Sequence, residues 1–312
     1  MPVKKYAALL VIGGSALWGT DALFRRPLTG FLSPVTIVFL EHCVLAVAVF
    51  PIIIACRDGF RHLKGSDYAL LLFVALGGSV AATSLFTFAI KYGNPSAVVL
   101  LQKTQPLFTA LLARLLLGER PPRRFWPWFV AAVAGAYLIS NPDWSGSRGS
   151  DPGHPAIALC ALGAAGLWGS ATVCGRFLVA RISTPFLTAL RCVLALPALL
   201  VLYILQSTPQ RTLPSSLPAV TGIITMALVA GLAALLLYYQ GLKSTSATMA
   251  SVCELSFPVT AVVVNWLVLN VSLSATQLAG AAILVASVTV TAFLSAREQD
   301  RLHSADAKPS NS

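Results

Sequence analysis

Long apolar stretches, separated by short polar breaks, follow one another along almost the whole chain. A stretch of about 17–25 apolar residues has the length of a helix that crosses a membrane. Because the stretches are continuous and do not alternate between apolar and polar residues, they indicate helices and not the strands of a barrel. The pattern predicts ten spans, which cover Tyr6–Phe24, Pro34–Cys56, Tyr68–Ile90, Ser96–Leu117, Phe125–Ser140, Ala156–Val179, Pro185–Leu205, Leu217–Tyr239, Ala247–Leu269 and Ala275–Ser295.

Motifs of the first half return in the second half at a spacing of 150 to 152 residues. Trp18–Gly19–Thr20 returns as Trp168–Gly169–Ser170, and Pro106 returns as Pro258. Since each half has five spans, an odd number, the second half enters the membrane from the opposite side, so the repeats are inverted. We therefore predict an all-α polytopic membrane protein with a first five-helix repeat (1–140), an external linker (141–155), a second five-helix repeat (156–296) and a disordered cytoplasmic tail (297–312).

Composition supports a membrane protein, and the charge distribution orients it. The chain is 56% hydrophobic and 11% charged, whereas soluble domains carry about 25% charged residues. Of the 22 Lys and Arg residues, fifteen fall on the side of the predicted N-terminus, five on the other side, and two, Lys103 and Arg191, within spans. This bias predicts that both termini are cytoplasmic, in a bacterial inner membrane. It also explains the net charge of +11 without a nucleic-acid partner.

Polar residues inside the spans are the candidates for a functional site. An ionisable group at the centre of a bilayer costs roughly 2.5–3.5 kcal/mol, so each one needs a partner or a water-filled cavity. The candidates for substrate binding are Glu41, His42, Gln102, Lys103, Arg191 and Glu254. Because neighbouring residues on a helix point about 100° apart, we expect only one of Glu41 and His42 to face the cavity.

Gln102 and Glu254 occupy repeat-related positions, each four residues before a proline. Pro106 and Pro258 lack the N–H that would bond the carbonyl of Gln102 or Glu254. We therefore predict a polar spot at each position and a hinge at each proline. Glu254 is the first candidate for charge recognition or proton coupling. The alternative is a salt bridge from Glu254 to Lys103 or Arg191.

Three aromatic residues join these candidates. Trp18 and Trp168 are repeat-related and lie well inside their spans, so their indoles are expected to clamp an apolar or planar substrate. Tyr238 is expected to add to that lining. The alternative for all three is the aromatic belt at the membrane surface. Near the span ends, Asp21 and Arg25 either shape an entrance or pair with each other at i,i+4 spacing. Glu119 falls in a predicted cytoplasmic turn, which is either a solvated turn or a gate.

In their order and spacing these motifs resemble the drug/metabolite transporter superfamily, and more narrowly its EamA-domain proteins. The resemblance extends from about Tyr6 to Phe293 and includes Leu117–Gly118–Glu119–Arg120. The second half departs from the family pattern, since it has Asn270–Val271 where Gly–Glu is typical. The resemblance implies a carrier that exports small metabolites, notably amino acids. An aromatic amino-acid exporter of the YddG kind is one branch within it.

The expected function is therefore secondary transport by alternating access, with an amino acid as the leading substrate. A cavity that contains both acidic and basic groups suits a zwitterion. Export of cationic drugs and import of another small solute are the alternatives within transport. An enzyme or a channel is the alternative outside it, but the sequence has neither metal-ligand spacing nor a filter motif. We expect no cofactor, membrane lipid around the protein, and a monomer or a homodimer.

Overall fold

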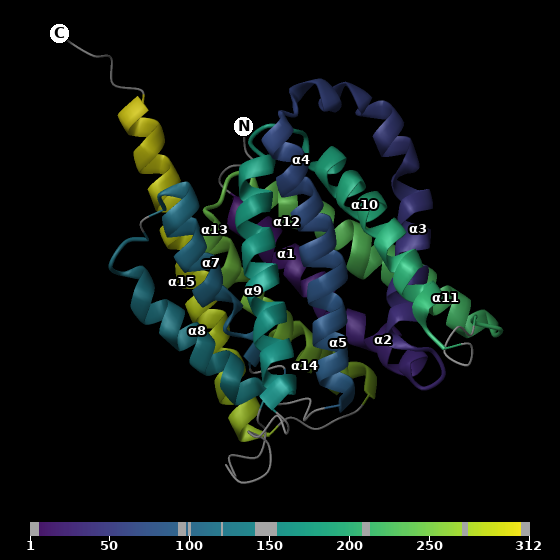
Figure 1. The fold of residues 1–312 in the computed structure, drawn as a ribbon. Coiled ribbons are helices and arrows are strands. Elements are labelled where there is room, and N and C mark those ends of the chain that lie inside the picture. The colour runs from purple at the N-terminus through teal and green to yellow at the C-terminus, as the bar shows by residue number, and fades with distance from the viewer. Residues whose placement is uncertain are drawn as a thin grey trace.

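Helices make up the fold of the described residues. The computed structural model describes residues 6–92, 98, 101–119, 121–140, 155–207, 213–269 and 274–306, and all regular elements in these ranges are helical (Figure 1). The first half contains α1 (Ala7–Gly19), α2 (Asp21–Thr29), α3 (Pro34–Ala55), η2 (Arg57–His62), α4 (Gly65–Leu72), η3 (Phe73–Ala81), α5 (Ala82–Tyr92), α7 (Gln105–Leu112), η4 (Ala113–Leu117) and α8 (Phe125–Ser140). The second half contains α9 (Pro155–Leu178), α10 (Thr184–Leu205), α11 (Leu217–Met226), η6 (Ala227–Ala233), α12 (Ala234–Leu242), α13 (Ala247–Cys253), η7 (Glu254–Ser256), α14 (Phe257–Leu269) and α15 (Ala275–Asp306).

Several of these helices have the length and composition to cross a membrane. Six helical stretches meet both criteria within the described residues, and they are Ala7–Thr29, Pro34–Ala55, Gly65–Ala89, Pro155–Leu178, Thr184–Leu205 and Leu217–Leu242. Shorter apolar helices cover Gln105–Leu117, Phe125–Leu138 and Ala275–Thr291. The all-helical architecture is confirmed for the described residues. The count of ten spans, their inversion and the side of the termini stay predictions.

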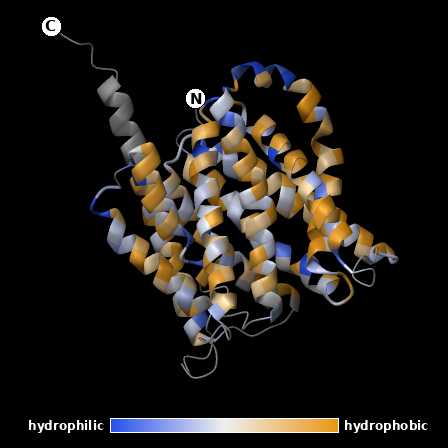
Figure 2. Ribbon diagram, viewed as in Figure 1, coloured by the Kyte–Doolittle hydropathy of each residue, from blue (hydrophilic) through white to orange (hydrophobic). Residues whose placement is uncertain are grey.

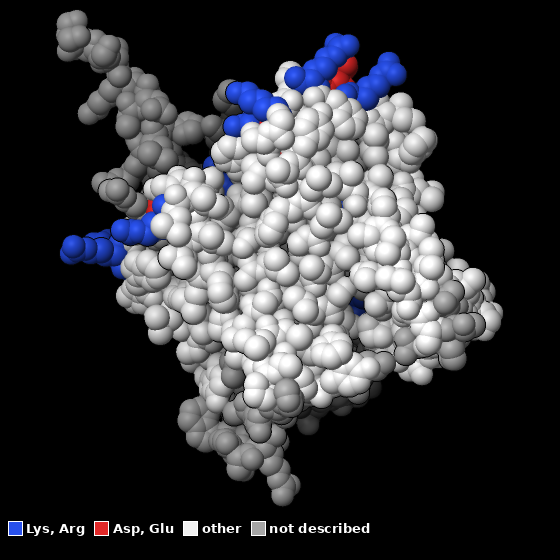
Figure 3. All heavy atoms as spheres, viewed as in Figure 1, with Lys and Arg blue, Asp and Glu red and all other residues white. Residues whose placement is uncertain are grey.

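The outer surface of the helix bundle is apolar. Large side chains such as Val47, Leu159 and Leu205 are more than two-thirds exposed, and apolar residues cover the outward-facing helices in Figure 2. Lys and Arg gather at the end of the molecule where α3 leads into α4, and few charged atoms interrupt the side seen in Figure 3. An apolar girdle with charge at its end is the surface that a bilayer requires.

Two elements differ from the sequence-based prediction. The first predicted span is interrupted at Thr20 and continues to Thr29, because the Thr20 hydroxyl bonds the Leu17 carbonyl at 2.7 Å and a new helix starts at Asp21. The last helix, α15, continues to Asp306, through part of the predicted disordered tail. Six of the ten added residues, 297–306, are Arg, Glu, Gln, Leu or Ala, which favour helix. The predicted linker, apart from Pro155, and residues 307–312 lie outside the described residues.

Two π-helical segments occur at repeat-related positions, which the sequence analysis did not predict. They are η3 (Phe73–Ala81) and η6 (Ala227–Ala233), and a shift of 152 residues superposes most of one on the other. Each interrupts a long helix and contains glycine. Because π-bulges leave backbone groups outside the regular α-helical bonding pattern, they often occur at functional sites.

In the main contacts between the halves, each helix of the first half packs on a helix of the second half, and the contacts are related by the repeat. α1 packs on α12 as α9 packs on α5, and the equivalent helices α3 and α10, and likewise α8 and α15, pack directly on each other. The contacts match in detail. A Cβ added to Gly13 would lie 3.9 Å from Leu237, and one added to Gly163 would lie 3.5 Å from Leu85. Two like halves that face each other across a common interface produce this packing.

The α1–α12 interface gives a first prediction from adjacent glycines. A Cβ on Gly14 would lie 2.6 Å from the Ala234 carbonyl oxygen and 2.9 Å from the Tyr238 backbone nitrogen, whereas a Cβ on Gly13 meets only ordinary contact. We expect Gly14→Ala to lower stability by about 1–3 kcal/mol through overpacking. Gly13→Ala, the control, should leave stability unchanged or raise it slightly, since alanine favours helix. Thermal unfolding in detergent measures both, and equal unfolding temperatures would contradict the packing described.

Candidate functional site

A cavity of about 380 Å³ lies between the two halves and is lined by residues of both. All nine residues predicted to bind substrate line it, and they are Trp18, Glu41, His42, Gln102, Lys103, Trp168, Arg191, Tyr238 and Glu254. The π segments contribute Gly78 and Ser79 from η3 and Gly231 from η6. Of the two predicted hinge residues, Pro106 lines the cavity and Pro258 is not among its lining residues.

Glu254 is the centre of a hydrogen-bond network that joins the halves. Its Oε1 accepts from the Tyr238 hydroxyl at 2.6 Å and from the Thr172 hydroxyl at 3.4 Å. Its Oε2 accepts from Nε2 of Gln105, in the first half, at 2.7 Å. Neutral donors therefore satisfy the carboxylate, as a charge inside a membrane protein requires.

The regular α-helix is interrupted just before both predicted prolines. In the first half, α7 begins at Gln105 after a turn at Lys103 and Thr104. In the second half, the short 3₁₀ segment η7 (Glu254–Ser256) precedes α14. The Glu254 carbonyl, which Pro258 cannot bond, accepts from the Ser15 hydroxyl at 2.6 Å. A polar spot therefore exists at Glu254, while motion about either proline stays a prediction.

The salt bridge predicted as an alternative for Glu254 is not formed. In the part of the chain that the structure describes, the ion pairs are Arg25–Asp21, Arg25–Glu41, Arg61–Asp58 and Arg181–Asp67. Arg191 bonds neutral groups instead, with Nε donating to the Ser79 hydroxyl and Nη1 to the Tyr239 hydroxyl, both at 2.8 Å. Lys103 Nζ lies 3.3 Å from the ring centroid of Phe257. The acid and the two bases thus stand apart on the cavity wall.

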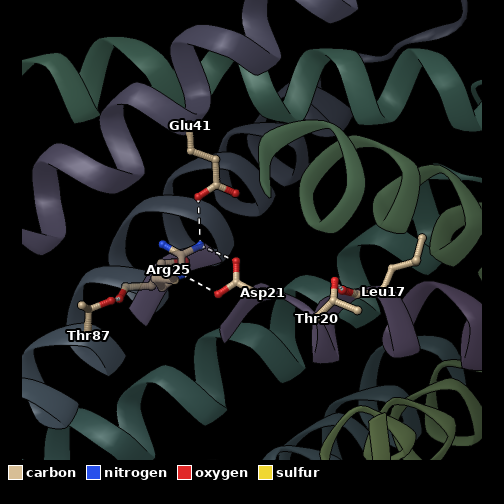
Figure 4. A network of polar contacts seen from close by, with 7 residues as sticks. Leu17, Thr20, Asp21, Arg25, Glu41 and Thr87 are labelled. Atoms are coloured by element: carbon tan, nitrogen blue, oxygen red, sulfur yellow. Dashed lines mark hydrogen bonds and ion pairs between the residues drawn. The ribbon is translucent and has the colours of Figure 1, made fainter. Parts of the chain in front are cut away.

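A second charged cluster lies at the α2 end of the cavity (Figure 4). Arg25 donates to both carboxylate oxygens of Asp21, at 2.5 and 2.8 Å, and to Oε2 of Glu41 at 3.0 Å. The i,i+4 pair expected from the sequence is confirmed, and Glu41 extends it to α3. His42 also lines the cavity, and its Nδ1 lies 2.9 Å from the carbonyl of Val38. The expectation that only one of Glu41 and His42 faces the cavity is wrong, because both belong to the one face of α3, Val38–Glu41–His42–Leu45 at i, i+3, i+4 and i+7, that lines the cavity.

Two pairs of aromatic side chains line the cavity. Trp18 packs on Tyr238 with ring centroids 5.1 Å apart, and Trp168 packs on Phe86 at 5.3 Å. Trp168 Nε1 donates to the carbonyl of Gly78, a backbone group within the π segment η3, at 2.9 Å, and this bond fixes the indole. A place in a surface belt does not describe these residues, since both tryptophans line the cavity and Tyr238 is buried.

At the end of the molecule where α4 and α13 begin, two polar contacts connect the halves. The Glu119 carboxylate accepts from the backbone nitrogens of Ala247 and Thr248, at 2.7 and 3.0 Å, and so caps α13. Arg181, in the turn after α9, forms an ion pair with Asp67, which is fully buried. The expectation of a solvated turn at Glu119 is wrong, because the N-terminal N–H groups of α13 need an acceptor.

The sequence analysis missed seven polar residues of the cavity, and three of these hydrogen-bond to Glu254 or Arg191. Gln105, Thr172 and Ser79 complete the networks of Glu254 and Arg191. Gln105 carried a usable signal, since it is a second amide one turn from Gln102. The hydroxyls carried none. In the described residues, no three His, Cys, Asp or Glu side chains gather closely enough to hold a metal ion. The arrangement offers a partly open cavity with aromatic side chains and separated hydrogen-bonding groups, which suits reversible binding.

Comparisons with known proteins agree with this geometry. The sequence profile of the EamA-like transporter family matches residues 5–141 and again residues 155–293. The chain is 31% identical over 294 residues to "Riboflavin transporter ImpX" of Fusobacterium nucleatum subsp. nucleatum, across 90% of this chain and 95% of that protein. It is 32% identical over 146 residues to "Riboflavin transporter" of Brucella anthropi, across 46% of this chain and 47% of that protein. One solved crystal structure aligns with a TM-score of 0.77 at 20% identity over 93% of this chain and 98% of the other, which shows the fold alone.

Proposed function

Because the chain belongs to the EamA-like transporter family, we propose that this multi-pass membrane protein carries a planar heteroaromatic solute of the riboflavin class. The observation that carries the proposal is the cavity between the halves, with aromatic walls from both. Its volume of about 380 Å³ lies within the range of roughly 300–1,000 Å³ typical of sites for drug-sized ligands. Two relatives whose names specify riboflavin support this class of solute.

The proposed mechanism is alternating access by two inverted halves in a bacterial inner membrane. The repeat-related packing of the helices and the paired π segments support it, since a site at the interface of two repeats opens to alternate sides when one half moves against the other. Pro106 and Pro258 would act as hinges. Glu254 would couple transport to protons, and no cofactor takes part. Export is the direction that the family resemblance favours, with a monomer or a homodimer as the working unit.

Amino-acid transport, possible for a YddG-like branch of the family, is the second candidate. The observation in its favour is that Glu254 and Lys103 both line the cavity without forming an ion pair with each other. Such an arrangement offers one group to each charge of a zwitterion. The cavity is nevertheless large for a single amino acid, so we rank this solute below a flavin.

Uptake into vesicles tests the proposal. We expect purified, reconstituted protein to transport labelled riboflavin with saturation and counterflow, and excess tryptophan or a cationic dye to compete weakly. Conductance without saturation would favour a channel, and chemical change of the solute an enzyme. Strong competition by tryptophan, with no riboflavin uptake, would replace the flavin by an amino acid. Inside-out and right-side-out vesicles assign the direction.

The aromatic wall adds a prediction within this assay. Stacking of a base on an aromatic side chain contributes about 1–3 kcal/mol, and 1.4 kcal/mol is about tenfold in affinity. We therefore expect Trp168→Leu to raise the KM for riboflavin about tenfold. Trp126→Leu is the matched control, because Trp126 is exposed and is not among the residues that line the cavity. An unchanged KM for Trp168→Leu would remove Trp168 from the binding surface.

A further inference from the structure

Two neighbouring cavity residues have polar atoms that the protein leaves unpaired. Among the described residues, the buried side-chain atoms without a hydrogen-bond partner are Gln102 Oε1, Lys103 Nζ, Thr245 Oγ1 and Thr291 Oγ1. Only Gln102 and Lys103 line the cavity. Lys103 is 1% exposed. Because native proteins pair nearly all buried polar groups, an unpaired acceptor and an unpaired donor at adjacent positions of a binding cavity point to a ligand.

The network around Glu254 fixes which end of the Gln102 amide is free. A carboxylate oxygen only accepts, so Gln105 must turn its Nε2 towards Glu254, at 2.7 Å. The Oε1 of Gln105 then accepts from Gln102 Nε2, at 3.1 Å. The oxygen of Gln102 is therefore the unpaired end, and turning the Gln102 amide over would set two acceptor oxygens against each other.

Lys103 supplies the complementary donor. Its ammonium has three N–H groups. It lies 3.3 Å from the ring centroid of Phe257, a contact that uses the positive charge but provides no hydrogen-bond acceptor. Phe257 itself lines the cavity. An unpaired acceptor and an unpaired donor thus occur at adjacent positions of the cavity lining, and the donor lies against an aromatic face.

We infer that Gln102 and Lys103 bind the imide-like edge of the solute, in which an N–H lies between carbonyl groups. Gln102 Oε1 accepts from the N–H, and Lys103 Nζ donates to a neighbouring carbonyl oxygen. The pyrimidine end of the riboflavin ring system carries such an edge, at N3, and its flat face suits Phe257. The inference rests on the proposed transport of a flavin-like solute and names the part of that solute which these residues select. Uracil and uridine carry the same edge on a smaller body.

Riboflavin and 3-methylriboflavin, which lacks the N3–H but keeps both carbonyls, test the assignment in reconstituted vesicles of the full chain. With wild-type protein we expect 3-methylriboflavin to compete about tenfold more weakly than riboflavin. In Gln102→Leu, riboflavin should bind about tenfold more weakly and the methylated compound about as before, so that the preference disappears. Lys103→Met should weaken both compounds alike. Thr291→Val, which removes an equally unpaired atom away from the cavity, is the control and should change neither.

The outcomes distinguish failure of the Gln102–Lys103 assignment from failure of the proposed riboflavin transport. Loss of the preference in Gln102→Leu, with normal yield and unfolding temperature, supports the assignment. A preference that persists in Gln102→Leu would overturn it, even though riboflavin is transported. If vesicles with wild-type protein take up no riboflavin, the proposed function is contradicted instead. In that case, uridine can be tested as a competitor in the transport of another solute. Competition that the wild type shows and Gln102→Leu does not would still support recognition of an imide edge.

Discussion

Replacing Glu254 with glutamine should reduce riboflavin transport by at least about tenfold. Both oxygens of Glu254 accept hydrogen bonds, from Tyr238 on one side and from Gln105 on the other. A glutamine must place an NH₂ group where one oxygen was, which opposes a donor to a donor. A hydrogen bond to a charged group contributes about 1.5–3 kcal/mol, and this corresponds to roughly 10–150-fold in an equilibrium constant.

The same variant tests proton coupling, because glutamine does not titrate. We expect transport by Glu254→Gln to lose the dependence on pH that the wild type shows, and initial rates measured across a pH series give the comparison. Asp58→Asn is the control, since Asp58 is an exposed carboxylate outside the cavity, and it should behave as wild type. Wild-type rates with an unchanged pH dependence in Glu254→Gln would rule out the coupling role.

Replacing Arg25 with glutamine should destabilise the protein by on the order of 3 kcal/mol, because it leaves two carboxylates without their cation. The side chains of Arg25, Asp21 and Glu41 are 23%, 26% and 12% exposed, so solvent replaces little of the lost interaction. For chains of 150–250 residues, 1 kcal/mol shifts the unfolding temperature by about 2–4 °C. We therefore expect a fall of about 5 °C or more in the apparent unfolding temperature in detergent.

Two further variants control this experiment. Arg61→Gln removes the cation of an exposed pair, with side chains 85% and 79% exposed, and should leave the unfolding temperature unchanged. The triple variant Asp21→Asn, Arg25→Gln and Glu41→Gln removes the unpaired charges and should recover most of the loss. A triple variant as unstable as the single one would show that Arg25 acts through packing and not through its charge.

The cavity residues could be predicted from the sequence because charge inside a membrane is costly and therefore conspicuous. Glu254, Lys103 and Arg191 stand out in apolar stretches, and the repeat singles out Trp18 with Trp168. Hydroxyl residues give no such signal, since they bond carbonyls of their own helix. Ser170 and Thr109 do so in the structure, and Thr172 differs only in the neighbours that folding brings to it.

Other features depend on contacts between distant helices, which a single sequence does not reveal. The contact of Glu41 with Arg25 joins two helices, and the capping of α13 by Glu119 joins two halves. The substrate prediction shows the same limit. Charged residues suggested a zwitterion because charges can be read in a sequence, whereas the volume of the cavity cannot.

The contacts of Glu119 and Asp67 make the two ends of the molecule unequal. A shift of 152 residues places Val271 at the position of Glu119 and Ala219 at that of Asp67, and neither can cap a helix or hold an arginine. Among the described residues of the proposed carrier, charged side chains therefore connect the two halves at this end, whereas the Arg25 cluster at the α2 end of the cavity joins helices of the first half only. A pair of identical halves would divide its time evenly between two openings. Without solute, we therefore expect this protein to favour the conformation that is closed at the end of Glu119 and Asp67 and open at the opposite face. The duplicated fold then has a preferred starting conformation for its transport cycle.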